Sequence, residues 1–305
     1  MPPMVRRTRV VSAAPRASKY LSVRLLAVAA LARTSRDMPV ASQRRCAGTF
    51  SERCLDTTGA PERRWLATGM SLLVLASAAT ASSLTLKYFD ARGAAETTRV
   101  LLTIGGIAYT DQRYPIGPGF EAPEFKADKE SGGLARNLGR APLLLTDEGA
   151  IGQSKAMERY VAGQAGLMGK TPFEAACIDM VAEHVRDVRE AQARKGFSRM
   201  ARGKTDDEKA ALAAEWYGTD LPSWLAKIEA CVVELAGEGA AHTVGGAVSY
   251  ADVCIWSLLR EGTVEDLARV AEAAAGCATL QCVAEGVAAL PAVAQWVEAR
   301  PATAF

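Results

Sequence analysis

The sequence predicts a small α/β domain over residues 84–166, followed by an all-α helical domain over residues 167–305. Two patterns predict this division: alternating strand patterns occur only before Lys170, and beyond it apolar residues recur at helical spacing. The length of 305 residues allows about two domains. A composition of 49% hydrophobic and 23% charged residues is that of a globular protein, which excludes collagen, a disordered chain and a disulfide-stabilised miniprotein.

The charges are unevenly distributed along the chain. Residues 1–64 contain 13 basic and 4 acidic side chains, whereas residues 65–305 contain 23 basic and 30 acidic ones. Because the larger part is mildly acidic, it offers no basic stripe to phosphate groups, and we expect no nucleic-acid partner. The seven cysteines include no CxxC pair, so we expect reduced thiols and neither a disulfide framework nor a metal site.

The first 83 residues are predicted to be a basic, disordered targeting leader. Met1 to Arg36 contains eight basic residues and no acidic one, interleaved with alanine, serine, valine and leucine. This composition is typical of cleaved mitochondrial or plastid transit peptides. The sequence therefore predicts that the protein is targeted to an organelle.

An uncharged apolar segment over residues 65–83 has three interpretations. It is a signal-like core with a basic flank at Arg63–Arg64 and a small-residue cleavage site at Ala79–Ala81. Alternatively, it anchors the chain in a membrane, although serine and threonine dilute the apolar run. In the third interpretation the true start is Met70, the upstream residues are a gene-model artefact, and the protein is cytoplasmic. A mature protein beginning near Ser82 would exclude the membrane anchor.

A strand, a helix and a second strand open the α/β domain. Residues 84–88 alternate and are rich in strand formers, residues 94–104 have helical spacing, and residues 107–113 alternate again. Gly105 marks the end of the helix. Two strands joined by a helix over so short a distance indicate a right-handed crossover and a parallel pair.

The second half of the α/β domain begins with a polar stretch rich in glycine and proline, residues 114–140. Its length favours a functional loop over a simple connection. Residues 142–146 and 150–151 predict a hairpin, and residues 153–165 predict a helix. The complete order is βαβ–ββα.

The rest of the chain is predicted to be helical. Apolar side chains lie on one face of a long helix, and Pro222 and Pro291 occupy positions that a first helical residue tolerates. The predicted helices cover residues 171–202, 206–217, 222–236, 249–261, 263–275, 279–289 and 291–299.

Common hydrolase and nucleotide-binding motifs do not occur in the sequence. It contains no GxSxG, Walker or HExxH pattern. Its two histidines are His184, in a charged helix, and His242, in a glycine- and alanine-rich linker. We expect a solvated or structural role for both.

Three features of the α/β domain converge on the edge of the sheet where α/β proteins bind ligands. Tyr88 ends the first strand, a place also taken by core tyrosines. The segment Gly139–Pro142 puts a proline at the start of a strand, where a cis bond would turn Ala141 toward a ligand, although trans is the commoner state. Gln153 and Ser154 open a helix whose amides attract a carboxylate, and Ser154 alternatively caps that helix.

Five segments in register resemble the glutathione transferase superfamily, most closely its sigma class. They are LTLKYFDARGAAETTR at 84–99, GRAPLLL at 139–145, IGQSKAMERYVA at 151–162, VSYAD at 248–252 and LPAVAQWVEARPATAF at 290–305. Together they extend over both predicted domains. The fourth segment resembles the family's capping box, formed here by Ser249 and Asp252.

The resemblance implies a thioredoxin-like domain that binds glutathione and a helical domain that builds a pocket for a hydrophobic electrophile. It implies that the Tyr88 hydroxyl donates to the glutathione sulfur and favours the thiolate. Gln153 and Ser154 would hold the γ-glutamyl end, and the backbone of Ala141 would pair with the cysteinyl unit. Lys126 resembles the family's lysine for the glycine carboxylate.

The resemblance also implies a homodimer. Arg140 and Pro142 belong to the same glutathione-binding loop. An acidic residue of the long helix would reach the neighbouring subunit's glutathione. Asp187 is the predicted residue, with Asp179 and Glu183 as alternatives.

Three positions depart from the sigma-class pattern. Ala122 stands where members often have tryptophan, and Ala94 and Arg194 replace residues of the prostaglandin D synthases, which argues against prostaglandin isomerase activity. A non-catalytic glutathione-binding or structural relative is therefore the alternative hypothesis. A glutathione-dependent isomerase or peroxidase is less favoured, and a thiol–disulfide oxidoreductase lacks a cysteine near Tyr88.

Overall fold

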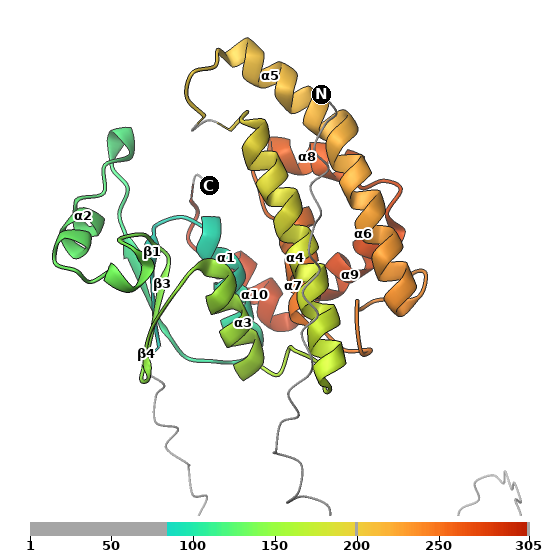
Figure 1. Ribbon diagram of the computed structural model, residues 1–305, viewed down its shortest axis with the longest axis horizontal. Helices are drawn as coiled ribbons and strands as arrows, with labels where there is room; N and C mark the ends of the chain where they lie inside the picture. Colours follow the sequence, from blue (N-terminus) through green and yellow to red (C-terminus); the bar gives the residue numbers. More distant parts are fainter. Residues whose placement is uncertain (1–83, 199–200, 304–305) are drawn as a thin grey trace, which may run out of the picture. The chain divides into compact units, whose positions relative to one another are not determined.

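A computed structural model describes residues 84–198 and 201–303 of the chain (Figure 1). The predicted leader, including its apolar segment 65–83, lies outside the described residues. The described part consists of a thioredoxin-like sheet domain followed by a helical domain, which confirms the predicted fold class.

The sheet has four strands in the order β2-β1-β3-β4. They are β1 (Thr85–Phe89), β2 (Thr110–Tyr114), β3 (Leu143–Thr146) and β4 (Gly149–Gly152). β1 and β2 are parallel, as the predicted crossover requires, and the other two pairs are antiparallel. The second strand begins at Thr110 and not at the predicted residue 107.

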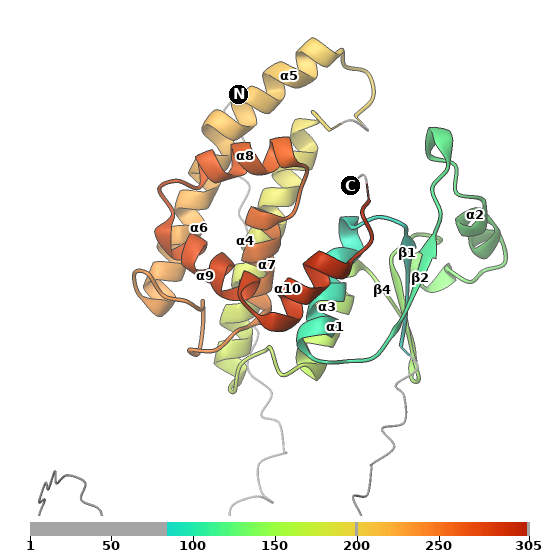
Figure 2. The ribbon, with the colours of Figure 1, turned by 180° about the vertical axis from the view of Figure 1, so that it is seen from behind.

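Two helices cover the face of the sheet that is turned toward the helical domain (Figure 2). They are α1 (Glu96–Ile104), preceded by a 3₁₀ turn at Gly93–Ala95, and α3 (Ser154–Gln164). Their apolar faces pack with Leu86 and Leu144 of the sheet in one core. The amino-terminal ends of both helices consequently lie near the carboxyl end of β1.

A short helix, α2 (Pro123–Glu130), lies within the stretch that the sequence predicted to be only a polar loop. It buries none of its residues, so no apolar periodicity marks it in the sequence. Tertiary contacts support it instead: the Phe125 ring lies 4.8 Å from that of Phe89, and Asp128 accepts a hydrogen bond from Lys87 at 2.9 Å.

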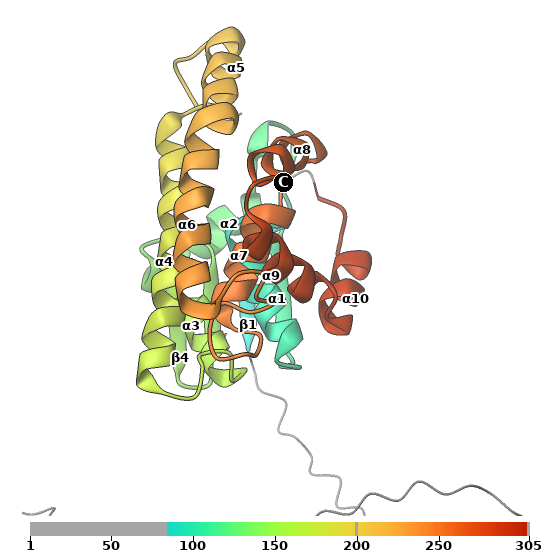
Figure 3. The same cartoon turned by 90° about the vertical axis from the view of Figure 1, so that its right-hand side faces the viewer.

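The helical domain packs around α7, whose residues Tyr250 to Leu259 are all buried. Its helices are α4 (Pro172–Lys195), α5 (Asp206–Glu215), α6 (Leu221–Ala236), α7 (Tyr250–Arg260), α8 (Val264–Ala273), α9 (Ala278–Ala288) and α10 (Pro291–Ala299). Figure 3 shows α4 and α6 side by side. Within the described ranges no single helix is long and apolar enough to cross a bilayer, and α9 and α10 meet that test only as a pair bent by 75°.

Two predicted boundaries in the helical domain were wrong. α4 ends at Lys195 and not at residue 202, because Gly196 adopts a left-handed conformation with φ of 73° and closes the helix. α5 and α6 are not separated by a loop, because a π-helical turn at Trp216–Asp220 joins them. Pro222 closely follows this π-helical turn, where the regular helical hydrogen bonding is already interrupted, so its missing N–H is tolerated there.

Candidate functional site

Tyr88 lies at the end of β1, with its hydroxyl beside the start of the first helix. The hydroxyl accepts a hydrogen bond from the Ala94 amide at 3.1 Å. Because a backbone N–H can only donate, the Tyr88 oxygen is the acceptor here, and its own proton is left to donate to another group. Gly93 makes this approach possible, because a Cβ at that position would stand 2.5 Å from the hydroxyl oxygen.

Arg99 holds the loop that follows Tyr88. Its guanidinium is fully buried, donates to the Ala91 carbonyl at 2.7 Å and pairs with Asp111 at 3.1 Å and Glu96 at 3.3 Å. It also lies 5.9 Å from the centre of the Tyr88 ring. Arg99 was not among the residues predicted for this site. A charged residue among the apolar positions of an amphipathic helix was the signal that could have identified it.

Glu96 connects the same helix to the end of the chain. Its carboxylate accepts from Arg300 at 2.7 Å and from the Trp296 indole at 2.9 Å. Arg300 also pairs with Glu261 at 2.9 Å. Burial raises the pKa of Glu261, and the charge of Arg300 opposes that shift. The C-terminal residues therefore help to fix the position of α1 beside the loop.

Asn137 joins the proline loop to the start of α3, and the sequence analysis missed it as well. Its amide nitrogen donates to the Pro142 carbonyl at 2.8 Å and to the Arg140 carbonyl at 3.1 Å. Its amide oxygen accepts from the Gln153 N–H at 3.1 Å. Gly152 leaves the necessary space, because a Cβ there would lie 2.7 Å from Asn137.

The peptide bond between Ala141 and Pro142 is cis. Pro142 is buried, Ala141 is partly buried and the Arg140 side chain is exposed. The backbone at Ala141 is therefore part of the candidate site, whereas the Arg140 side chain points toward solvent.

Ser154 is the first residue of α3, and Gln153 occupies the capping position with φ of 67°. No side chain caps this helix, so the alternative role of Ser154 as a cap was wrong. The Gln153 side chain is exposed. The start of α3 therefore presents backbone amides, a hydroxyl and an amide side chain together, which suits an anionic ligand group.

The remaining predicted contacts lie apart from this cluster. Lys126 is exposed on α2, with its ammonium 3.9 Å from Glu130. Asp187 is exposed on α4. Its two alternatives are already paired: Asp179 lies 2.5 Å from the Arg159 guanidinium, and Glu183 pairs with Arg159 as well.

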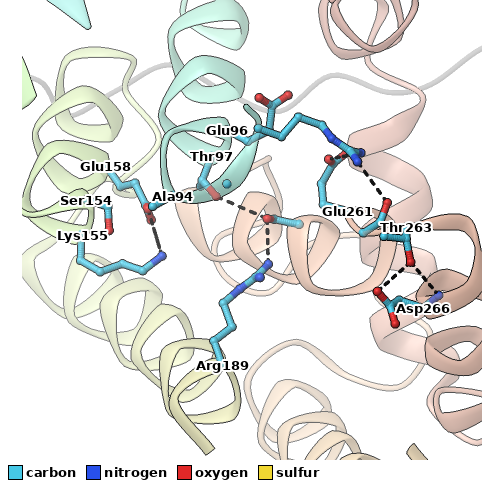
Figure 4. A pocket seen from close by; sticks show the side chains of 14 residues that line it. Ala94, Glu96, Thr97, Ser154, Lys155, Glu158, Arg189, Glu261, Thr263 and Asp266 are labelled. Atoms are coloured by element: carbon cyan, nitrogen blue, oxygen red, sulfur yellow. Dashed lines mark hydrogen bonds and ion pairs between the residues drawn. The ribbon is translucent and has the colours of Figure 1, made fainter. Parts of the chain in front are cut away.

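A cavity of about 450 Å³ brings the Tyr88 loop and the start of α3 to one place (Figure 4). Its lining residues come from the ends of α1 and α3 and from α4, α7 and α8. They are Arg92, Gly93, Ala94, Glu96, Thr97, Ser154, Lys155, Glu158, Arg189, Ser257, Glu261, Gly262, Thr263 and Asp266. Tyr88 is not itself a lining residue, but its hydroxyl is hydrogen-bonded to the amide of Ala94, which is one, and this places the hydroxyl next to the cavity.

Ser249 and Asp252 form the predicted capping box at the start of α7. The Asp252 carboxylate accepts from the Ser249 amide and from the Thr243 amide, both at 2.8 Å. Burial raises the pKa of Asp252, and these hydrogen bonds counteract it. His242 lies 3.5 Å from the same carboxylate, which agrees with a structural role. Among the residues that the structure describes, no cluster of histidine, cysteine and acidic side chains is arranged to hold a metal ion.

Comparison with known proteins identifies the family. Residues 84–163 match the model of the glutathione S-transferase N-terminal domain, and residues 192–300 match that of the C-terminal domain. Glutathione S-transferase 1 of Ascaris suum is 30% identical over 170 residues, which cover 56% of this chain and 75% of that protein. The hematopoietic prostaglandin D synthase of Gallus gallus is 36% identical over 102 residues, which cover 33% of this chain and 46% of that protein.

Among solved structures, that of monomeric Na-GST-3 from Necator americanus is similar, with a TM-score of 0.60 and 28% identity. The match covers 73% of this chain and all of that one. The chain spans about half the length of the two chicken relatives that it matches. Fold and site thus define a glutathione-transferase-like protein. The chain belongs to the glutathione S-transferase family, and the sigma class within it stays a prediction.

Proposed function

We propose that the protein is a glutathione transferase in which Tyr88 stabilises the thiolate of glutathione for attack on a hydrophobic electrophile. One observation carries the proposal: the Tyr88 hydroxyl accepts from the Ala94 amide at the edge of a cavity that Ser154 also lines. The relatives named as glutathione S-transferases support transferase activity in general. The tyrosine mechanism and the type of electrophile are our inference.

Activation of the thiol follows from the chemistry of the Tyr88 hydroxyl. A free cysteine thiol has a pKa of about 8.5, so only a small fraction is thiolate at neutral pH. A hydroxyl that donates to sulfur stabilises the anion, and the N–H of Ala94 polarises that hydroxyl further. The positive end of α1 acts in the same direction. The thiol proton leaves to solvent, and the sulfur lone pair forms the new bond to carbon. With a chloroarene the carbon–chlorine bond then breaks and chloride leaves with the electron pair; in an addition a π bond opens and its far carbon takes a proton from solvent.

The γ-glutamyl end of glutathione is proposed to bind at the start of α3. Gln153 and Ser154 contribute side chains there, and the uncapped amides and dipole of α3 attract its carboxylate. The backbone of Ala141 would pair with the cysteinyl unit within the loop Arg140–Pro142. The Lys126 ammonium would bind the glycine carboxylate after leaving Glu130, an exposed partner at 3.9 Å.

A homodimer in which Asp187 reaches the partner's glutathione is part of the proposal. Asp187 is exposed, whereas Asp179 and Glu183 are held by Arg159. One similar structure is described as monomeric. Light scattering therefore tests this point directly, because a monomer at the working concentration would remove the role of Asp187.

An organellar location is proposed from the basic leader, and a membrane anchor or a cytoplasmic protein starting at Met70 are its alternatives. A fluorescent fusion of the full chain, compared with one that starts at Met70, tests this. Loss of organellar fluorescence in the shorter fusion is the expected result. Identical distributions would contradict a targeting leader.

Substitution of Tyr88 by phenylalanine tests the mechanism. We expect kcat/KM with an activated chloroarene and glutathione to fall by about 100-fold, the effect of removing one donor from a developing anion. The KM for glutathione should change little, because the other contacts remain. Tyr160→Phe, a partly buried tyrosine of α3, is the matched control. Full activity in Tyr88→Phe would overturn the assigned role.

The alternative is a relative that binds glutathione without catalysis, which Ala122 and the exposed position of Lys126 favour. Retention on immobilised glutathione, with no turnover of any electrophile, would support it. A thiol–disulfide oxidoreductase is disfavoured because residues 84–166 contain no cysteine.

A further inference from the structure

Arg189 is a cation in the cavity that has no carboxylate partner. It reaches from α4 into the cavity, as Figure 4 shows, and its Nη2 donates to the Ser257 hydroxyl at 2.9 Å. Among residues 84–198 and 201–303, no carboxylate lies within the 4.0 Å that defines an ion pair with this guanidinium. Burial lowers the pKa of Arg189, and the charges of Glu158 and Glu261 oppose that shift.

The other cations in the cavity wall are already paired. Arg92 lies 3.4 Å from Glu261, and Lys155 lies 2.8 Å from Glu158. The carboxylates are likewise occupied, since Glu158 also accepts from the buried Tyr250 hydroxyl at 2.7 Å.

The two other acidic residues of the wall follow the same rule. Glu96 is bound by Arg300 at 2.7 Å, and Asp266 accepts from Tyr217 at 3.0 Å. Each acidic group of the wall therefore has hydrogen-bond or ion-pair partners other than Arg189, and Glu158 and Glu261 act on Arg189 only through space. Arg189 is partly buried and faces the cavity without an ion-pair partner, so its guanidinium suits an anion supplied by a ligand.

Ser257 adds a second donor beside Arg189. Its hydroxyl oxygen accepts from Arg189 and also from the Thr97 hydroxyl at 3.4 Å. With its oxygen accepting twice, the proton of Ser257 is available to donate. A guanidinium and a hydroxyl side by side match the two oxygens of a carboxylate.

We propose that Arg189 and Ser257 form a subsite for the carboxylate of the electrophile, so that the substrates are apolar electrophiles carrying an acid group. This rests on the proposed function. For an unsaturated ketone with a carboxylate tail, the thiolate sulfur would bond to the β-carbon and a proton from solvent would add to the α-carbon. The carboxylate itself would remain unchanged in the subsite.

Glutathione itself is another source of a carboxylate, because Ser154 lines the same cavity. The KM values for the electrophile and for glutathione distinguish the two sources of the carboxylate. If Arg189 binds the electrophile, its loss changes the KM for acidic electrophiles and leaves the KM for glutathione within about twofold. A selective rise in the KM for glutathione would overturn the proposal.

Equilibrium binding tests the subsite. The full chain is saturated with S-methylglutathione, and the probes are 4-phenylbutanoate and its uncharged amide. We expect the wild type to prefer the acid by about tenfold or more, the effect of one charged hydrogen bond, and Arg189→Met to lose that preference. Arg189→Lys should keep part of it. Arg186→Met, on the exposed side of the same helix, is the control and should bind like the wild type.

Two results would contradict the subsite: an unchanged acid preference in Arg189→Met, or no preference in the wild type. The Tm of Arg189→Met is measured alongside binding. Removal of a cation that has no ion-pair partner should not lower the Tm, whereas removal of an arginine that supports the fold would lower it. If Arg189→Met does not fold, Ser257→Ala is measured in its place. This variant should reduce the preference for the acid over the amide, by less than we expect for Arg189→Met. Because the probes are unreactive, the result stands even if the wild type turns over no electrophile and the proposed function fails.

Discussion

The two ends of the proposed glutathione site differ in how firmly they are built. At the sulfur and γ-glutamyl end, Arg99 and Asn137 are buried and tie separate elements of the α/β domain together. At the glycine end, Lys126 stands exposed on a helix that buries none of its residues. Buried side-chain contacts are therefore concentrated where the bond is made, whereas the end distant from the thiol depends on an exposed charge.

Arg99→Met should have the largest effect on stability. Removing Arg99 leaves the Ala91 carbonyl without its donor, Glu96 with only Arg300 and Asp111 with only Arg113. Because a buried ion-pair network loses one member, the free energy of unfolding should fall by about 3 kcal/mol or more. Urea denaturation measures this. Arg186→Met, which breaks only exposed ion pairs, should cost less than about 1 kcal/mol. If both variants lost the same free energy of unfolding, the buried position of Arg99 would not explain its contribution to stability.

Asn137→Ala comes next. It leaves the carbonyls of Pro142 and Arg140 and the amide of Gln153 without their partner, so we expect a loss of about 2–3 kcal/mol in stability. The KM for glutathione should rise as well, because both binding segments lose their common anchor. A stable variant with an unchanged KM would show that the loop and α3 hold their places without Asn137.

Gly93→Ala should act on the reaction more than on folding. The new methyl group would collide with the Tyr88 hydroxyl and displace it, so kcat should fall by about tenfold or more. Gly106→Ala is the matched control: its φ of 60° is also left-handed, but nothing lies within 4 Å of its added Cβ. Gly106→Ala strains the backbone without displacing the Tyr88 hydroxyl, so its kcat should be unchanged. Equal kcat values in the two variants would contradict the placement of the hydroxyl.

Lys126→Met should have the smallest effect. An exposed ion pair contributes about 0–1 kcal/mol, so urea denaturation should show almost no change. Steady-state kinetics should show a rise in the KM for glutathione of about threefold and a constant kcat, because a solvated charge contact is weak. A loss as large as that of Asn137→Ala would mean that the glycine end is as firmly built as the other.

The order of the elements and much of the site could be predicted from the sequence. Tyr88, Gln153 and Ser154 stand at element ends, which periodicity and capping patterns locate, and Ser249 and Asp252 carry a local signature. α2 was missed because its contacts are with distant rings and charges, not within its own pattern.

The groups that organise the site could not be predicted, because their roles arise from tertiary contacts. Asn137 lies in a polar stretch where nothing distinguishes it until the proline loop and α3 meet around it. Arg189 resembles any basic residue of a charged helix until α7 places Ser257 beside it. Sequence patterns are local, whereas both of these functions depend on which side chains the fold brings together.

Titration of glutathione bound to the protein measures how far the Tyr88 hydroxyl lowers the pKa of the thiol. The ultraviolet absorbance of the thiolate, followed against pH for the wild type and for Tyr88→Phe, gives the pKa of the bound thiol. The account predicts a pKa at least about one unit below the ordinary value of about 8.5 in the wild type, and a return toward that value in the variant. The same pKa in both proteins would contradict the role of the Tyr88 hydroxyl.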